Sequence, residues 1–267
     1  MRLFDIVKKS SAMYRANPIL ILPPFVSMVF SLVTLFVIGS PPDSPTSGAS
    51  ALELMRYAFT VFGVLFLNLI ISFLVILGQV SMTREVILEG KTGLSDWGKG
   101  IKRYFLRVLG IGLIYLVLVW ALSMFVGGIS LLTILAHTLP SPQISTLILI
   151  MISSVSTLLM TVASTIFYIW LAPAVIDDKE VFESLKAGTE AMGKGGKTFL
   201  GFIALYFLVS LVTLLIAPPS YFGTSVQPSS VEYITPKGVT SQVITTIFSP
   251  LWFLIAFTIY NEQKSVT

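Results

Sequence analysis

The sequence is poor in the residue types on which most catalytic and metal chemistry depends. It contains no cysteine, which excludes a disulfide framework, a thiolate nucleophile and a cysteine-ligated metal site. Its single histidine, His137, excludes any site that needs two imidazoles. Charged residues are also scarce, at 11% of the 267 residues, whereas soluble domains have about 25%. The chain therefore lacks the polar coat of a soluble globular enzyme.

Apolar residues are correspondingly abundant. They make up 55% of the chain and include 19 Phe, and the mean hydropathy is +0.90. So many large apolar side chains do not stay solvated in a disordered protein. Six stretches have the roughly 20 apolar residues that cross a hydrocarbon core, and none contains Asp, Glu, Lys, Arg or His. They predict an all-α, polytopic membrane bundle with spans at 18–38, 57–80, 108–135, 144–171, 199–217 and 243–260.

The few charges are unevenly distributed between the two sides of this topology. Of the 17 Lys and Arg residues, 15 lie on the side that holds both termini, and only Arg56 and Lys237 lie on the other. Because short cytoplasmic loops carry the excess of basic residues, both termini are predicted to be cytoplasmic. The formal charge of +4 is thereby explained by topology, and no nucleic-acid partner is expected.

A charged stretch precedes the first, third and fifth spans, and each has the apolar spacing of an amphipathic helix. In each, an acid lies three residues before a lysine. We therefore expect one membrane domain over 1–267, with repeat-like units 1–80, 92–171 and 178–260, each a cytoplasmic interfacial helix followed by a transmembrane hairpin. Duplication and convergent topology signals both remain open explanations. The three pairs are Asp5 with Lys8, Asp96 with Lys99 and Glu183 with Lys186.

The basic side chains of these helices are candidates for contact with anionic lipid headgroups or with a protein partner. Each Lys or Arg near an anionic surface contributes about 1 kcal/mol. The same residues could instead only anchor the hairpins at the interface. A homo-oligomer is a further open alternative. The candidates are Lys8, Lys9, Arg15, Lys99, Lys102, Arg103, Lys194 and Lys197.

Hydroxyl side chains follow one face of the fourth predicted span. Ser153, Thr157, Thr161 and Thr165 are spaced four residues apart, and Asn68 in the second span is a further polar residue. Such a face could line a polar path for a solute or lipid. Alternatively, small hydroxylated residues let neighbouring helices approach closely and hydrogen-bond.

Catalytic signatures are weak throughout the sequence. Residues 191–198 fit a relaxed phosphate-loop pattern, but no strand precedes them, so a helix end broken by glycines is expected. The predicted spans contain no carboxylate pair for an aspartyl dyad. Asp177 and Asp178 are assigned a capping role, with capping-box spacing from Asp177 to Glu180. We expect no enzymatic activity, no cofactor and no metal site.

Several short motifs resemble a group of prokaryotic six-span proteins that are similar to the membrane domain fused to some glycerophosphodiester phosphodiesterases. The motifs lie across nearly the whole chain, but the phosphodiesterase catalytic domain is missing. The resemblance thus implies a helical bundle in a prokaryotic cytoplasmic membrane and a lipid-related or accessory role, without hydrolase activity. The motifs are Tyr14-Arg-Ala-Asn-Pro18, Gly90-Lys-Thr-Gly-Leu-Ser-Asp96, Leu171-Ala-Pro173, Asp177-Asp178 and Glu183-Ser-Leu-Lys186.

Two functional hypotheses follow. The first is a non-enzymatic scaffold or accessory protein that contacts lipids through its interfacial helices. The second is a transporter or channel that uses the Ser/Thr face of the fourth span. A transporter needs a polar cavity near the middle of the membrane, which a structure can reveal.

Overall fold

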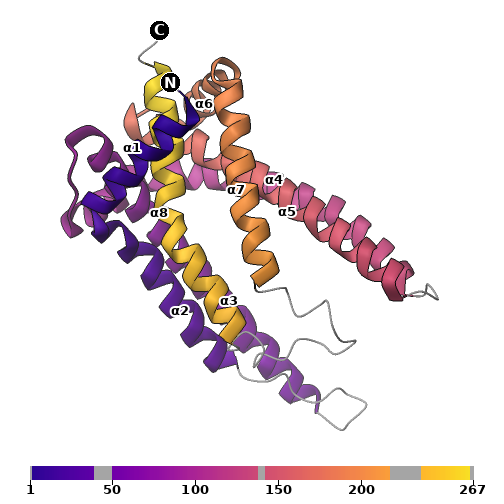
Figure 1. Ribbon diagram of the computed structural model, residues 1–267. Helices are drawn as coiled ribbons and strands as arrows, with labels where there is room; N and C mark the ends of the chain where they lie inside the picture. Colours follow the sequence, from indigo (N-terminus) through magenta and orange to yellow (C-terminus); the bar gives the residue numbers. More distant parts are fainter. Residues whose placement is uncertain (1, 39–49, 138–141, 217–235, 265–267) are drawn as a thin grey trace.

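A computed structural model describes residues 2–38, 50–137, 142–216 and 236–264 (Figure 1). The described part of the chain is helical and contains no β-strand. The elements are α1 (Leu3–Ala16), η1 (Pro18–Ile21), α2 (Leu22–Ile38), α3 (Ala51–Glu89), α4 (Leu94–His137), α5 (Pro142–Ile176), α6 (Val181–Lys194), α7 (Gly196–Ile216) and α8 (Pro236–Lys264).

Five of the described helices, α3, α4, α5, α7 and α8, are long and apolar enough to cross a membrane. The pair formed by Leu3–Ala16 and Pro18–Thr34 is bent by 94° and would count as a sixth span if taken as one unit. The chain is thus an all-helical, multi-pass membrane protein by the length and composition of its helices.

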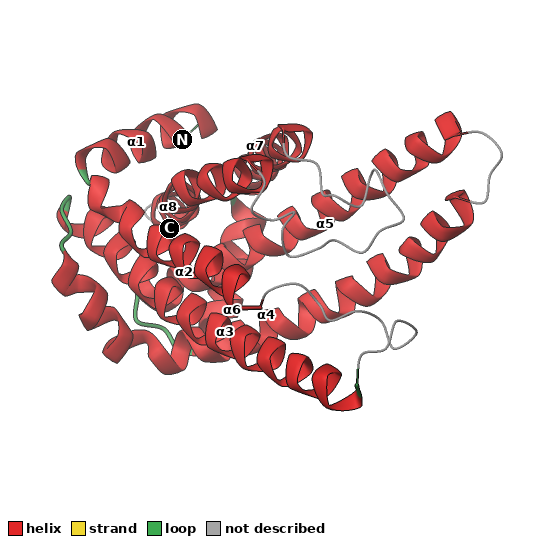
Figure 2. Cartoon of the chain, turned by 90° about the horizontal axis from the view of Figure 1, so that it is seen from below, coloured by secondary structure: helices red, strands yellow, loops and turns green. Residues whose placement is uncertain are grey.

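The helices meet at one end and diverge toward the other. Both chain termini and α6 lie at the end where they meet, whereas α4 and α5 extend away from the remaining helices (Figures 1 and 2). α5 and α8 nevertheless have the most buried stretches: 61% of the most apolar stretch of each is buried, against 11–17% in α3, α4 and α7.

Two of the three expected amphipathic segments form separate helices, and the third does not. α1 and α6 are 14 residues each, whereas the segment that starts at Leu94 continues without a break into α4. The difference follows from the local sequence. Pro18 disfavours the helical conformation at Asn17, and Gly195 ends α6, but no proline or capping residue interrupts α4 between Arg103 and Val108.

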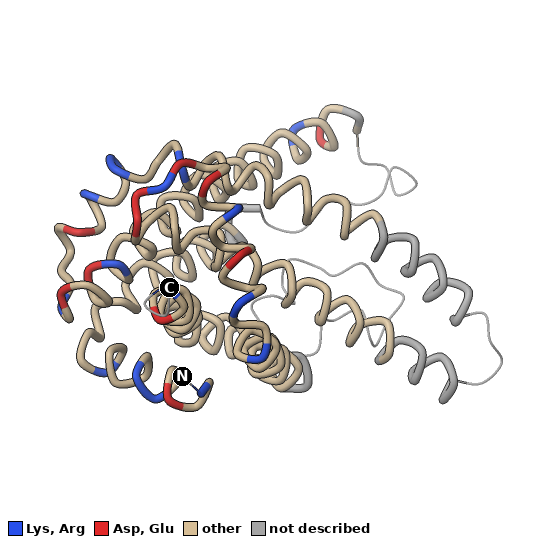
Figure 3. The backbone as a smooth tube through the Cα atoms, turned by 90° about the horizontal axis from the view of Figure 1, so that it is seen from above, with Lys and Arg blue, Asp and Glu red and all other residues tan. Residues whose placement is uncertain are grey.

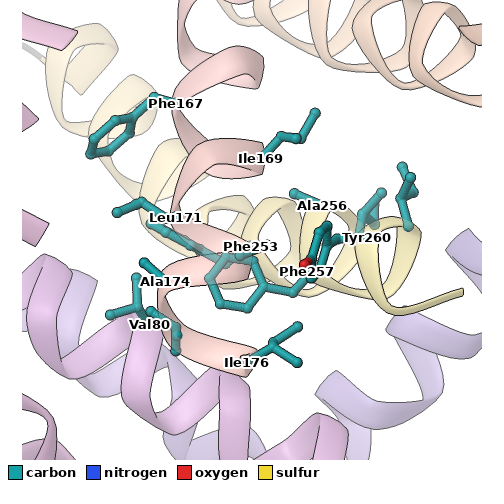
Figure 4. Packing of buried hydrophobic residues seen from close by; sticks show 14 of the residues in the cluster. Val80, Phe167, Ile169, Leu171, Ala174, Ile176, Phe253, Ala256, Phe257 and Tyr260 are labelled. Atoms are coloured by element: carbon teal, nitrogen blue, oxygen red, sulfur yellow. The ribbon is translucent and has the colours of Figure 1, made fainter. Parts of the chain in front are cut away.

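The apolar core lies between α5 and α8 at the end where the helices meet. Leu171 and Ala174 of α5 lie against Phe253 of α8, and Val80 of α3 closes the same layer (Figure 4). Large apolar side chains on the peripheral helices point outward instead, with Phe62 70% and Leu106 76% exposed. An apolar outer face of this kind is suited to lipid tails.

Candidate functional site

An ion-pair cluster ties α4 to the turn between α5 and α6. Arg103 donates from Nε to Asp178 Oδ1 over 3.1 Å and also from Nη2 to Oδ2, and Arg107 Nη1 donates to Oδ1 over 2.9 Å. Arg107 reaches Glu180 as well, at 3.4 Å. Asp178 has a left-handed backbone with φ of +55°, which aspartate tolerates better than most residues. This conformation places its carboxylate between the two guanidinium groups.

The cluster changes the ionisation of Asp178. Partial burial acts to raise the pKa of this carboxyl, but the hydrogen bonds and positive charges of Arg103 and Arg107 outweigh it, so that the pKa lies below its usual value. Asp178 is therefore ionised at neutral pH, and both arginines are used in holding the fold together.

Asp177 and the N-terminal helix are tied to α8 in the same way. Asp177 accepts hydrogen bonds from Tyr260 Oη at 2.7 Å and from Lys264 Nζ at 2.6 Å. Lys9 of α1 pairs with Glu262 at 2.6 Å. The expected capping role of Asp177 is therefore wrong: the N-cap of α6 is Glu180, which makes no side-chain capping bond. The capping-box spacing was present, but partners 83 and 87 residues away compete more strongly for the carboxylate.

Asn17 joins the start of the membrane bundle to the turn between α3 and α4. Its Nδ2 donates to the carbonyls of Met13 (3.0 Å) and Gly90 (3.2 Å), and its Oδ1 accepts from the Thr92 N–H (3.2 Å). Gly90 has φ of +77°, a conformation that favours glycine. Two of the short motifs quoted above thus contact each other, which gives them a structural role.

The eight predicted basic contact residues divide into two groups. Lys9, Lys99 and Arg103 are held in ion pairs. Lys99 pairs with Asp96 at 2.9 Å. Of the three predicted acid–lysine pairs, only this one appears among the described ion pairs. The other five basic residues are exposed and take part in none of the described ion pairs. They are Lys8, Arg15, Lys102, Lys194 and Lys197.

The charged residues gather around the chain termini, with few on the helices that extend away (Figure 3).

Residues 191–198 form the end of α6 and the start of α7, with the Gly195 N–H bonded to the Ala191 carbonyl at 2.9 Å, as the glycine pattern predicts. His137 ends α4, and its side chain lies outside the described residues.

The Ser/Thr face of the fourth span is buried at Thr161 and Thr165 and half-buried at Ser153 and Thr157. Thr161 and Thr165 are 4% and 1% exposed, and Thr157 donates its hydroxyl hydrogen to the Ser153 carbonyl at 2.8 Å. Asn68 accepts a hydrogen bond from Ser72 at 3.4 Å. None of the four α5 residues lines the cavities described below, which lie beside α8.

No protein-family model, curated protein or solved structure matches the chain.

A cavity with several polar lining residues, not predicted from the sequence, lies between α2, α3 and α8, and we name it the α8 cleft. It has a volume of about 430 Å³. A second cavity of about 230 Å³, between α5, α7 and α8, shares Thr245 and Ser249 with it. The sequence feature that indicates the α8 cleft is the row of polar residues at 241, 242, 245, 246 and 249 in the last span. The lining residues of the α8 cleft are Pro24, Ser27, Met28, Ser31, Ser72, Val75, Ile76, Ser241, Gln242, Thr245, Thr246 and Ser249.

Proposed function

We propose that this chain is a non-enzymatic integral membrane protein whose basic end binds anionic lipid headgroups, as a scaffold or accessory protein for a partner. In this proposal both termini are cytoplasmic, and the chain lies in a prokaryotic cytoplasmic membrane as three hairpins with interfacial segments. One observation supports this proposal most strongly: several exposed Lys and Arg side chains take part in none of the described ion pairs, and they lie next to helices with apolar outer faces.

The paired and unpaired cations have different parts in this function. Arg103, Arg107 and Lys9 hold helices together, so their charge is largely compensated within the fold. Lys8, Lys102, Lys194 and Lys197 are exposed and uncompensated by any described ion pair. They come from α1, α4 and the α6–α7 junction, so the positive charge extends across this end. A phosphate-bearing headgroup at the rim of the bundle meets these ammonium groups, while its acyl chains contact the apolar helix faces.

The resemblance to phosphodiesterase-linked membrane domains agrees with this proposal at the level of a lipid-related, accessory role. The transporter hypothesis has less support, because Thr161 and Thr165 are buried and none of the four Ser/Thr residues lines either cavity beside α8. The cavities beside α8 contain polar side chains, but nearly all of these come from helices other than the one that carries the predicted Ser/Thr face.

The experiment measures lipid preference on the full-length chain in nanodiscs that contain phosphatidylglycerol and phosphatidylcholine. Native mass spectrometry counts the lipids of each kind that stay bound to the protein after it is released from the nanodisc. At about 1 kcal/mol for each cation, changing Lys8, Lys102, Lys194 and Lys197 together to Gln is expected to lower the preference for phosphatidylglycerol at least about tenfold.

The matched control removes a compensated pair instead. The double variant Asp96→Asn with Lys99→Gln leaves the net charge unchanged and alters the same face of α4 as Lys102→Gln. It is expected to keep the lipid preference. If the variant with all four lysines changed to Gln retains its preference for phosphatidylglycerol, these cations only orient the helices.

A further inference from the structure

The α8 cleft brings a group of polar side chains together within an otherwise apolar part of the bundle. At 1.5 Å per residue, Ser72 lies about 24 Å from Arg56 and about 18 Å from Arg84 along α3, so the cleft reaches the middle of the apolar stretch of that helix. Seven hydroxyl side chains and Gln242 line it. Polar groups at this depth need partners, and Gln242 Oε1 has none.

The cleft has acceptor capacity at three hydroxyls that already donate, and both donor and acceptor capacity at the four other hydroxyls and the Gln242 amide. Thr245 and Thr246 donate their hydroxyl hydrogens to the carbonyls of Ser241 (3.0 Å) and Gln242 (2.8 Å), and Ser72 donates to Asn68. Their oxygens can then only accept further bonds. Gln242 Oε1 is buried without a hydrogen-bond partner.

Pro250 adds to this acceptor character. It lies inside α8 and has no N–H, so it removes the donor that would otherwise pair with the Thr246 carbonyl. Thr246, Gln242 and Ser249 all line the cleft. The middle of α8 thus presents side-chain and backbone oxygens together, and a ligand that donates several hydrogen bonds is complementary to it.

The lining also limits the charge of such a ligand. It contains no Lys, Arg or His that would balance an anion and no Asp or Glu that would balance a cation. Because an ion without a counter-charge is costly to remove from water, the cleft selects an uncharged ligand that forms hydrogen bonds, such as one whose hydroxyls both donate and accept. We propose that the α8 cleft binds a neutral polyol group, carried by a lipid headgroup or by a free solute, whose hydroxyls donate to Gln242, Thr245 and Thr246.

The test uses the full-length chain in nanodiscs of phosphatidylcholine, whose headgroup has no N–H or O–H donor. One arm adds a glucosyl diacylglycerol to the bilayer, and the other adds free glucose to the buffer. Native mass spectrometry measures the occupancy of the added molecule. Binding in the first arm alone identifies a lipid headgroup, binding in the second alone identifies a soluble polyol, and binding in both supports the shared chemistry.

Three variants locate the binding. Because each removes an acceptor, Thr246→Val and Gln242→Leu are each expected to lower occupancy about fivefold, whereas Thr246→Ser retains it. Thr157→Val is the matched control, since the Thr157 hydroxyl also bonds to its own helix but lies outside the cleft. The melting temperature of each variant checks that it folds. Absence of binding in both arms, or binding that Thr246→Val and Gln242→Leu leave unchanged, would overturn the proposal without affecting the role of the basic end.

Discussion

The end of the bundle where the helices meet and the apolar ends that diverge are held by different forces. At the meeting end, ion pairs and hydrogen bonds link α1, α4, α5, α6 and α8, and the side chains of α5 and α8 are buried. In the diverging part, large side chains of α3, α4 and α7 point outward. Lipid tails are as apolar as leucine, so they give helices no hydrophobic reason to associate. Close packing and polar contacts must then hold the bundle, and both are concentrated at one end.

A large loss of stability is expected where Gly100 of α4 packs against α3. A Cβ at Gly100 would lie 2.3 Å from Ser81 Cβ and 2.8 Å from the Leu77 carbonyl oxygen. Because backbone must then move, Gly100→Ala is expected to destabilise the protein by about 2–3 kcal/mol. Thermal unfolding in detergent measures this. The control is Gly112→Ala on the same helix, where no neighbouring atom lies within 4 Å of the added Cβ. Equal losses of stability in the two variants would refute the close-contact explanation.

Loss of the ion-pair cluster should cause the next largest decrease in stability. Asp178→Asn leaves Arg103 and Arg107 without their main partner, and the carboxylate is only 35% exposed. We expect a loss of about 1–2 kcal/mol, between the values for exposed and buried pairs. The comparison variant is Glu53→Gln at the opposite end of α3, where the carboxylate only completes an exposed capping box with Ser50. A larger loss from Glu53→Gln would reverse the comparison between the two ends.

The same cluster predicts a pH dependence of stability. Since the folded pKa of Asp178 is lowered, its contribution is complete above the unfolded value of about 3.9 and is lost as the pH falls through the folded pKa. Wild-type stability in melting experiments should therefore change little through Asp178 between about pH 5 and 7 and decrease below about pH 4. Asp178→Asn should lack this part of the decrease. Identical acid profiles for the two proteins would exclude the cluster as its source.

The smallest effect is expected on the outer face of the peripheral helices. Leu106 is 76% exposed, whereas Leu171 is fully buried. Leu106→Ala should change the unfolding free energy in a lipid nanodisc by less than about 0.5 kcal/mol. Leu171→Ala should cost about 2–3 kcal/mol through its cavity. Similar losses at the two positions would mean that the outer face is covered by protein.

The sequence predicted the helical class and the apolar stretches because both depend on local composition. It could not predict the partners of Asp177 and Asp178, since an acid after a span has the same local pattern whether it caps a helix or pairs with α4 and α8. The continuous α4 was also missed, because amphipathic spacing shows which face is apolar and does not show where a helix bends. The row from Ser241 to Ser249 was visible, but its polar residues gain significance only beside α2 and α3.

The position of α1 has a consequence for how the protein is made. α1 lies along α8, where Lys9 pairs with Glu262, Ser10 Oγ donates to Thr258 Oγ1 at 3.4 Å, and Tyr14 Oη donates to the Ile247 carbonyl at 3.0 Å. These contacts join α1 to α8, the first and the last of the described helices along the chain. α1 cannot complete its packing until α8 has been synthesised and inserted, so the spans between them must enter the membrane before this part of the bundle closes.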